Sequence, residues 1–168
     1  IKKMNQIKDR YFISINVDEG CNLACPSCRI HKINYTSGSQ YESRLRIAKH
    51  LVDLINKFDK PCEVMMSGNG DPFASLVYRP LLLNMEPKDN IHIRMLTNAL
   101  MLKKVMPKTK IKDSIRYLDI SIDAGDKATY ERLRLGGRWE VLLENLDYVK
   151  QEFDCEVTLK FVLQRDNV

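Results

Sequence analysis

The chain has 168 residues, of which 44% are hydrophobic and 29% charged, and these values are ordinary for one soluble globular domain. The sequence contains no apolar run near the ~20 residues that cross a bilayer, so we expect no membrane partner. The net charge of +5 comes from lysines and arginines that are scattered over the predicted helices, and only 8% of the residues are aromatic. Both observations argue against a nucleic-acid-binding protein.

Segments with the patterns of strands and of helices alternate along the chain. Apolar, β-branched runs predict five strands, over 11–17, 63–68, 92–98, 117–123 and 156–164. Amphipathic or capped stretches predict the helices, over 40–58, from Ala74 onward with a bend at Pro80, over 101–106, from Asp126 to Gly136 and over 138–153. Strands separated by helices indicate βαβ units, and we therefore expect an α/β fold with a parallel sheet.

Two of these helices carry more detailed expectations. Ser39 and Glu42 have the spacing of a capping box at the start of the first helix. The apolar face of that helix is predicted to consist of Ala48, Leu51, Val52, Ile55 and Phe58. The apolar face of the last helix is predicted to consist of Trp139, Leu142, Leu143, Leu146, Val149 and Phe153.

Polar and glycine-rich residues follow four of the predicted strands. Three cysteines follow the first strand and the stretch GNGDP follows the second. Thr97 and Asn98 end the third strand, and Ser121 and Asp123 end the fourth. Ligands of parallel α/β proteins bind at the carboxyl ends of the strands, so the sequence predicts one site at this rim.

Cys21, Cys25 and Cys28 have the spacing Cys-x3-Cys-x2-Cys. Such crowding favours metal or cluster ligation in a reducing compartment over disulfides, so we expect a cytoplasmic protein. Thiolates bind both zinc and iron–sulfur clusters. A closed zinc site needs four ligands, and His31 is the nearby fourth candidate. A four-iron cluster held by three cysteines instead leaves one iron open. Cys62 and Cys155 are expected to pack as ordinary small residues.

The three-cysteine spacing after a first strand resembles the signature of the radical S-adenosylmethionine (radical SAM) superfamily, and the resemblance extends from about Tyr11 to Asn167. It implies a 4Fe-4S cluster whose open iron is chelated by S-adenosylmethionine (SAM). One electron from the reduced cluster would cleave SAM to a 5′-deoxyadenosyl radical that abstracts hydrogen from a substrate. Such cores usually have six βα units. We therefore expect residues 1–168 to form a radical SAM core domain that is a partial (β/α) barrel of five units, incomplete at its C-terminal end.

The resemblance also implies contacts with SAM. In S-G-N-G-D-P, the residues Asn69, Gly70, Asp71 and Pro72 match the family's Gly-Gly-Glu-Pro, which receives the methionine ammonium group, and Gly68 precedes them. Asp71 has one methylene group fewer than the family's Glu, so its carboxylate reaches less far from the backbone. The family usually has an aromatic residue where this chain has Ser27, whose backbone is expected near the adenine.

Three residues toward the C-terminal end complete the predicted cofactor site. Ser121 matches a polar residue that binds the ribose hydroxyls or the carboxylate of SAM. Asp123 is either the alternative to Ser121 or the cap of the following turn. Arg134 resembles an arginine that pairs with the methionyl carboxylate through a bidentate fork, and a surface arginine is the alternative.

The pattern YERLR-GG resembles the branch with SPASM or twitch C-terminal domains, whose members modify peptides or small molecules. The resemblance implies an electron donor such as a flavodoxin or ferredoxin. It leaves the substrate and the catalytic residues open. The rival interpretation is a non-catalytic iron–sulfur or zinc module, which would need no SAM-binding rim.

Overall fold

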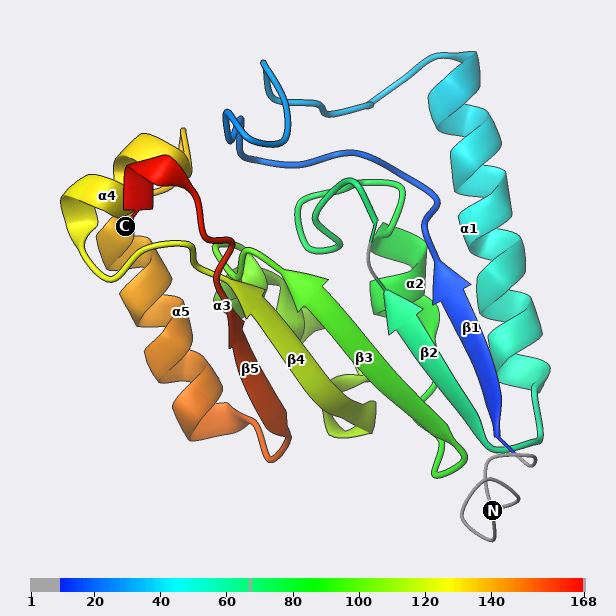
Figure 1. Ribbon diagram of the computed structural model, residues 1–168. Helices are drawn as coiled ribbons and strands as arrows, with labels where there is room; N and C mark the ends of the chain where they lie inside the picture. Colours follow the sequence, from blue (N-terminus) through cyan, green and yellow to red (C-terminus); the bar gives the residue numbers. More distant parts are fainter. Residues whose placement is uncertain (1–9, 67, 168) are drawn as a thin grey trace, which may run out of the picture.

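The structure is a computed structural model that describes residues 10–66 and 68–167. Five strands form one sheet in the order β1-β2-β3-β4-β5, and each neighbouring pair is parallel (Figure 1). The strands are β1 Tyr11–Ile15, β2 Cys62–Met66, β3 Ile91–Thr97, β4 Ile115–Ser121 and β5 Glu156–Lys160. The α-helices are α1 Ser39–Lys57, α2 Arg79–Asn84, α3 Leu102–Val105, α4 Lys127–Leu133 and α5 Trp139–Glu152. The described residues also form the short 3-10 helices η2 Met106–Lys108, η3 Lys112–Ser114 and η4 Arg165–Asn167.

The order of the strands in the sheet is their order in the chain, which is the arrangement of consecutive βα units in a partial barrel. The predicted α/β fold is thereby confirmed. In Figure 1 the helices α2 and α3 lie behind the sheet, while α1 and α5 flank it. The connection that carries the cysteines, drawn in blue, passes over the carboxyl ends of the strands. None of the helices that the structure describes is long and apolar enough to span a membrane.

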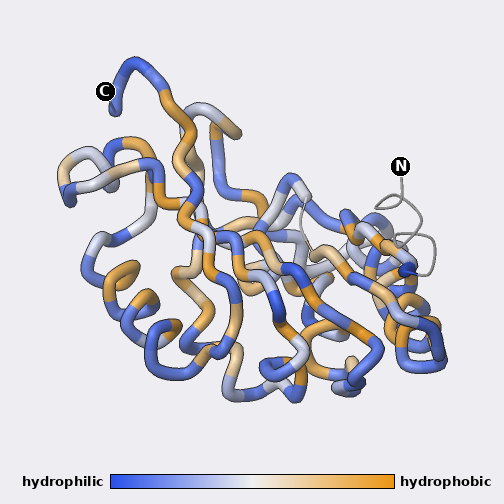
Figure 2. The backbone as a smooth tube through the Cα atoms, turned by 60° about the horizontal axis from the view of Figure 1, so that its bottom comes forward, coloured by the Kyte–Doolittle hydropathy of each residue, from blue (hydrophilic) through white to orange (hydrophobic). Residues whose placement is uncertain are grey.

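Alternation along the central strands divides the sheet into two faces. In β3 every second residue from Ile91 to Thr97 is buried, and the residues between them are half-buried. The buried set packs with the helices in one hydrophobic core. Figure 2 shows hydrophobic and hydrophilic residues alternating along the tube. β5 differs, because all five of its residues are exposed.

The predicted capping box at the start of α1 is wrong. Gly38 occupies the N-cap position with φ of 92°, and no side chain caps the helix. The backbone N–H of Glu42 donates to the carbonyl of Gly38 at 3.0 Å. Ser39 is therefore the first residue of the helix and not its cap. Gly38 takes the cap position, because its positive φ is a backbone conformation that serine rarely adopts.

The helix predicted from Ala74 is also wrong, since residues 72–78 form turns and α2 begins only at Arg79. The Asp71 carboxylate accepts from the N–H of Ala74, and the Ser75 hydroxyl accepts from the N–H of Val77. Side chains of this kind compete with helical hydrogen bonds. Pro80 does not bend a helix but lies in the first turn of α2, where its missing N–H costs nothing.

The apolar face predicted for α5 is wrong at one position. Leu143 is 42% exposed, whereas Leu142 and Val149 are buried as expected. Asn145 occupies a buried place instead, where its side-chain oxygen accepts from the N–H of Lys103 at 2.8 Å. Asn145 thereby satisfies a free N–H in the first turn of α3, which an apolar side chain could not do.

Candidate functional site

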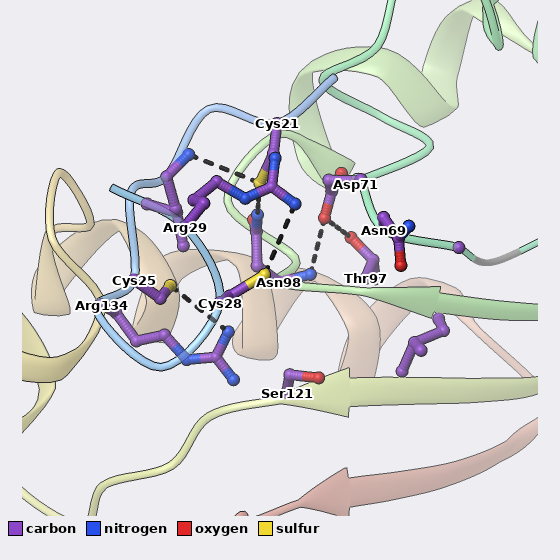
Figure 3. Close-up of a pocket in the computed structure, with 14 residues that line it drawn as sticks. Cys21, Cys25, Cys28, Arg29, Asn69, Asp71, Thr97, Asn98, Ser121 and Arg134 are labelled. Atoms are coloured by element: carbon purple, nitrogen blue, oxygen red, sulfur yellow. Dashed lines mark hydrogen bonds between the residues drawn. The ribbon is translucent and has the colours of Figure 1, made fainter. Parts of the chain in front are cut away.

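A pocket of about 220 Å³ opens at the carboxyl ends of the strands (Figure 3). Its walls come from the cysteine loop, the turn after β2, the ends of β3 and β4, and the segment after α4. The lining residues are Cys21, Leu23, Cys25, Cys28, Arg29, Gly68, Asn69, Gly70, Asp71, Leu96, Thr97, Asn98, Ser121 and Arg134. Nine of the eleven predicted site residues are among them, so the rim brings together segments that lie far apart in the sequence.

Each of the three thiols in the pocket has an N–H donor beside its sulfur. Cys21 Sγ lies 3.5 Å from the backbone nitrogen of Leu23. Cys28 Sγ lies 3.5 Å from Arg29 Nη2, and Cys25 Sγ lies 3.9 Å from an Arg134 nitrogen. Burial raises the pKa of the Cys21 and Cys25 thiols. Donors of this kind stabilise sulfur that carries negative charge, and the donor set therefore suits thiolate ligands of a cluster.

The zinc alternative lacks a matching arrangement in the part of the chain that the structure describes. There, no group of three or more His, Cys, Asp or Glu side chains is placed to hold a single metal ion. His31 is exposed and is not among the residues that line the pocket. The three cysteines line one open cavity, a placement that fits a group larger than one ion.

The start of the cysteine loop is held by a charged network that the sequence analysis did not find. The buried Asp18 carboxylate accepts from the Ser75 hydroxyl at 2.6 Å, from Arg44 at 2.8 Å and from the N–H of Gly20 at 3.0 Å. Glu19 accepts from the Tyr35 hydroxyl at 2.9 Å and from Arg44 at 3.2 Å. These two donors lower the pKa of Glu19. The loop is therefore tied to α1 and to the turn before α2.

The glycine turn after β2 packs directly against the start of the cysteine loop. The N–H of Asp71 donates to the carbonyl of Gly20 at 2.8 Å. A Cβ atom added at Gly70 would lie 2.4 Å from that same carbonyl oxygen. Gly68 has φ of 129°, in the region that favours glycine. The turn thus needs glycines for close approach and for conformation.

Gly70→Ala is expected to lower the free energy of unfolding by about 1–3 kcal/mol, because the added methyl group meets backbone atoms that cannot rotate away. Gly125→Ala is the matched control, since a Cβ at that exposed glycine meets nothing within 4 Å. Its effect should stay within about 0.5 kcal/mol. Urea unfolding of both variants measures the difference. Equal stability of the two variants would contradict the close packing of turn and loop.

The Asp71 carboxylate is buried and accepts four hydrogen bonds. One oxygen accepts from the Thr97 hydroxyl at 2.8 Å and from the N–H of Asn98 at 2.7 Å. The other accepts from the N–H groups of Phe73 and Ala74 at 3.0 and 3.2 Å. Burial raises the pKa of Asp71, and these donors oppose the rise. Asp71 therefore joins the turn after β2 to the end of β3, which Figure 3 shows beside the cysteines.

Ser121 and Arg134 line the pocket, whereas Asp123 is not among the lining residues and pairs with Arg134. Arg134 Nη2 and Asp123 Oδ2 are 2.6 Å apart, and the buried Arg134 Nε has no hydrogen-bond partner among the described residues. The other Asp123 oxygen accepts from the N–H of Val162 at 2.8 Å. Asp123 thus orients Arg134 and fixes the segment after β5. The cap of the following helix is Asp126.

The pocket also differs from the predicted set. Ser27 is exposed and does not line the pocket, and the predicted position of its backbone near the adenine stays a prediction. Leu23, Arg29 and Leu96 line the pocket without having been predicted. For Arg29 a signal was present, because it directly follows the third cysteine. Leu96 carries no signal beyond its place near the end of a strand.

Comparison with known proteins connects this site to one family. The model of the "Radical SAM superfamily" matches residues 15–165. The crystal structure of Streptococcus suis SuiB bound to the precursor peptide SuiA superposes with a TM-score of 0.57 at 18% identity, over 98% of this chain and 36% of that chain. SuiB bound to S-adenosylmethionine gives a TM-score of 0.57 at 19% identity, over 97% of this chain and 37% of that one.

The chain thus spans little more than a third of the length of these two solved structures. At this identity the similarity establishes a shared fold. A search of the curated proteins finds no match.

Proposed function

The chain belongs to the radical SAM superfamily, and from this premise we propose that it is the core of an enzyme in which Cys21, Cys25 and Cys28 hold a 4Fe-4S cluster. SAM would bind beside the cluster in the pocket of Figure 3. When both are bound, the reduced cluster supplies one electron for cleavage of SAM to methionine and a 5′-deoxyadenosyl radical, which takes hydrogen from the substrate.

The observation that carries the proposal is the convergence of two chemically different sets of groups in one pocket. Three thiols with N–H donors form one wall, which suits a cluster. The turn at residues 68–71, Ser121 and Arg134 form the rest of the polar lining. A non-catalytic metal module would need the first set and has no use for the second.

The polar lining offers partners for each charged part of SAM. The Arg134 guanidinium lines the pocket and suits the methionyl carboxylate. The turn at residues 68–71 lines the pocket and carries the buried Asp71 carboxylate, which suits a site for the ammonium group. The Ser121 hydroxyl suits a ribose hydroxyl or the carboxylate. The buried Asp123 keeps Arg134 in place, so the site is organised before SAM binds.

For the substrate we propose a peptide or a protein side chain. Support comes from the shared fold of SuiB, whose structure contains a precursor peptide. A small molecule is the alternative. A flavodoxin or ferredoxin would deliver the electron.

The protein, reconstituted with iron and sulfide without oxygen and then reduced, is expected to bind SAM and release 5′-deoxyadenosine and methionine. The cluster is measured by its broad visible absorption, and the products are measured by chromatography with mass detection. Zinc-loaded protein is the control, because zinc supplies no electron. A reduced, cluster-loaded protein that forms no 5′-deoxyadenosine would overturn the proposed function.

A further inference from the structure

The side chain of Asn98, at the end of β3, lies against the first cysteine of the motif. Its Nδ2 is 3.7 Å from Cys21 Sγ and 2.9 Å from Asn22 Oδ1. Its Oδ1 accepts from the N–H of Leu100 at 3.1 Å. The Leu100 N–H can only donate, so the atom of the Asn98 amide that faces it must be the oxygen. The NH₂ group of the amide therefore faces the sulfur of Cys21.

The position of this amide is fixed by the surrounding chain. Asn98 is 5% exposed, and its own N–H donates to the Asp71 carboxylate at 2.7 Å. The next residue, Ala99, is buried and has φ of 64°, a left-handed conformation that residues other than glycine seldom adopt. Its N–H donates to the Thr97 hydroxyl at 3.0 Å. Unusual backbone conformations of this kind persist where the surroundings over-determine them.

We propose that Asn98 is a positioning residue that acts through Cys21 and raises the reduction potential of the cluster. The inference rests on the proposed function, because it requires Cys21 to be a cluster ligand. Reduction transfers one electron from a low-potential donor to the cluster, and no bond forms or breaks. The added negative charge is shared with the ligand sulfurs, so an N–H donor stabilises the reduced state more than the oxidised state.

Asn98 differs in its setting from the other donors to sulfur. The backbone N–H of Leu23 also donates to Cys21, but it belongs to the cysteine loop itself and stays in place when a side chain is replaced. The Arg29 hydrogen bond to Cys28 is exposed, where water weakens it. Arg134 is already paired with Asp123. Asn98 is neutral and buried and lies at the end of β3, outside the cysteine loop. Its bond to Cys21 is partly buried, so water screens it less than the exposed bond between Arg29 and Cys28.

The test compares Asn98→Ala with Asn22→Ala in reconstituted protein. Asn22→Ala removes the other acceptor of the same amide but leaves the donor facing the sulfur. The midpoint potential is followed by electron paramagnetic resonance during titration with dithionite and redox mediators. For Asn98→Ala we expect a roughly tenfold loss in the equilibrium constant for reduction, a shift of ~59 mV to more negative values for one electron. Asn22→Ala should keep the parent potential.

The outcomes separate this inference from the function on which it rests. If the unsubstituted protein assembles no cluster after reconstitution, the proposed function itself is wrong. A fully loaded Asn98→Ala variant with the parent potential would overturn the role of Asn98 and leave the proposed function intact. Asn98→Ser retains a short donor and is expected to restore part of the potential. If neither Asn98 variant assembles a cluster, the inference is also contradicted, because Asn98 would then be needed for the cysteine loop to fold and not for the potential of the cluster.

Discussion

Replacing Cys21, Cys25 or Cys28 with alanine is expected to remove the 4Fe-4S cluster from the reconstituted protein. A cluster with three protein ligands has no spare thiolate, so loss of one should leave an assembly too weakly held to survive purification. The pocket contains these three cysteines and no other. Iron and acid-labile sulfide analysis, together with the visible absorption of each variant, measures the loss.

Cys62→Ala and Cys155→Ala are the matched controls. Cys62 begins β2 and is buried, and Cys155 directly precedes β5, so both lie at the amino ends of strands, opposite the pocket. The expectation that these residues pack as ordinary side chains agrees with their contacts in the core. Both variants should assemble the parent amount of cluster. A cluster that survives in Cys25→Ala would remove the central claim about this site.

The strands and the cysteine site could be predicted because their signals are local. The three cysteines lie within eight residues, and one spacing is enough to indicate ligation. Alternation of apolar residues likewise marks β3 within seven residues. The rule that ligands bind at the carboxyl ends of parallel strands then brings the separate segments to one rim. Ser121 lies in the pocket as this rule predicts, and Arg134 joins it there as the family resemblance implied.

What could not be predicted depends on contacts between distant residues. Asp18 is buried because Arg44 and Ser75, which are 26 and 57 residues further along the chain, reach its carboxylate. Nothing in the stretch around Asp18 indicates those partners. Asn145 is buried for the same kind of reason, since its partner is the backbone of Lys103. Periodicity assigns such polar residues to solvent, and tertiary hydrogen bonding then overrides it.

Asp71→Ala is expected to weaken SAM binding by about 1.5–3 kcal/mol, roughly a 10- to 150-fold rise in Kd. The substitution removes a buried negative charge beside the turn proposed to receive the SAM ammonium group. It also releases the turn, because four donors lose their acceptor. We expect the free energy of unfolding to fall by about 3 kcal/mol for that reason. Titration of reconstituted, oxidised protein with SAM and urea unfolding measure the two effects.

Thr97→Val is the control that keeps the Asp71 carboxylate, since it removes one donor to that carboxylate and the acceptor of the Ala99 N–H. It should lower the free energy of unfolding by about 1–3 kcal/mol and raise the Kd for SAM less than threefold. If Asp71→Ala is less stable but binds SAM as tightly as the parent, the acidic residue only holds the turn together. Weak binding by Asp71→Ala with near-parent binding by Thr97→Val instead assigns the effect to the charge. The four hydrogen bonds then serve to keep that charge in place at the pocket.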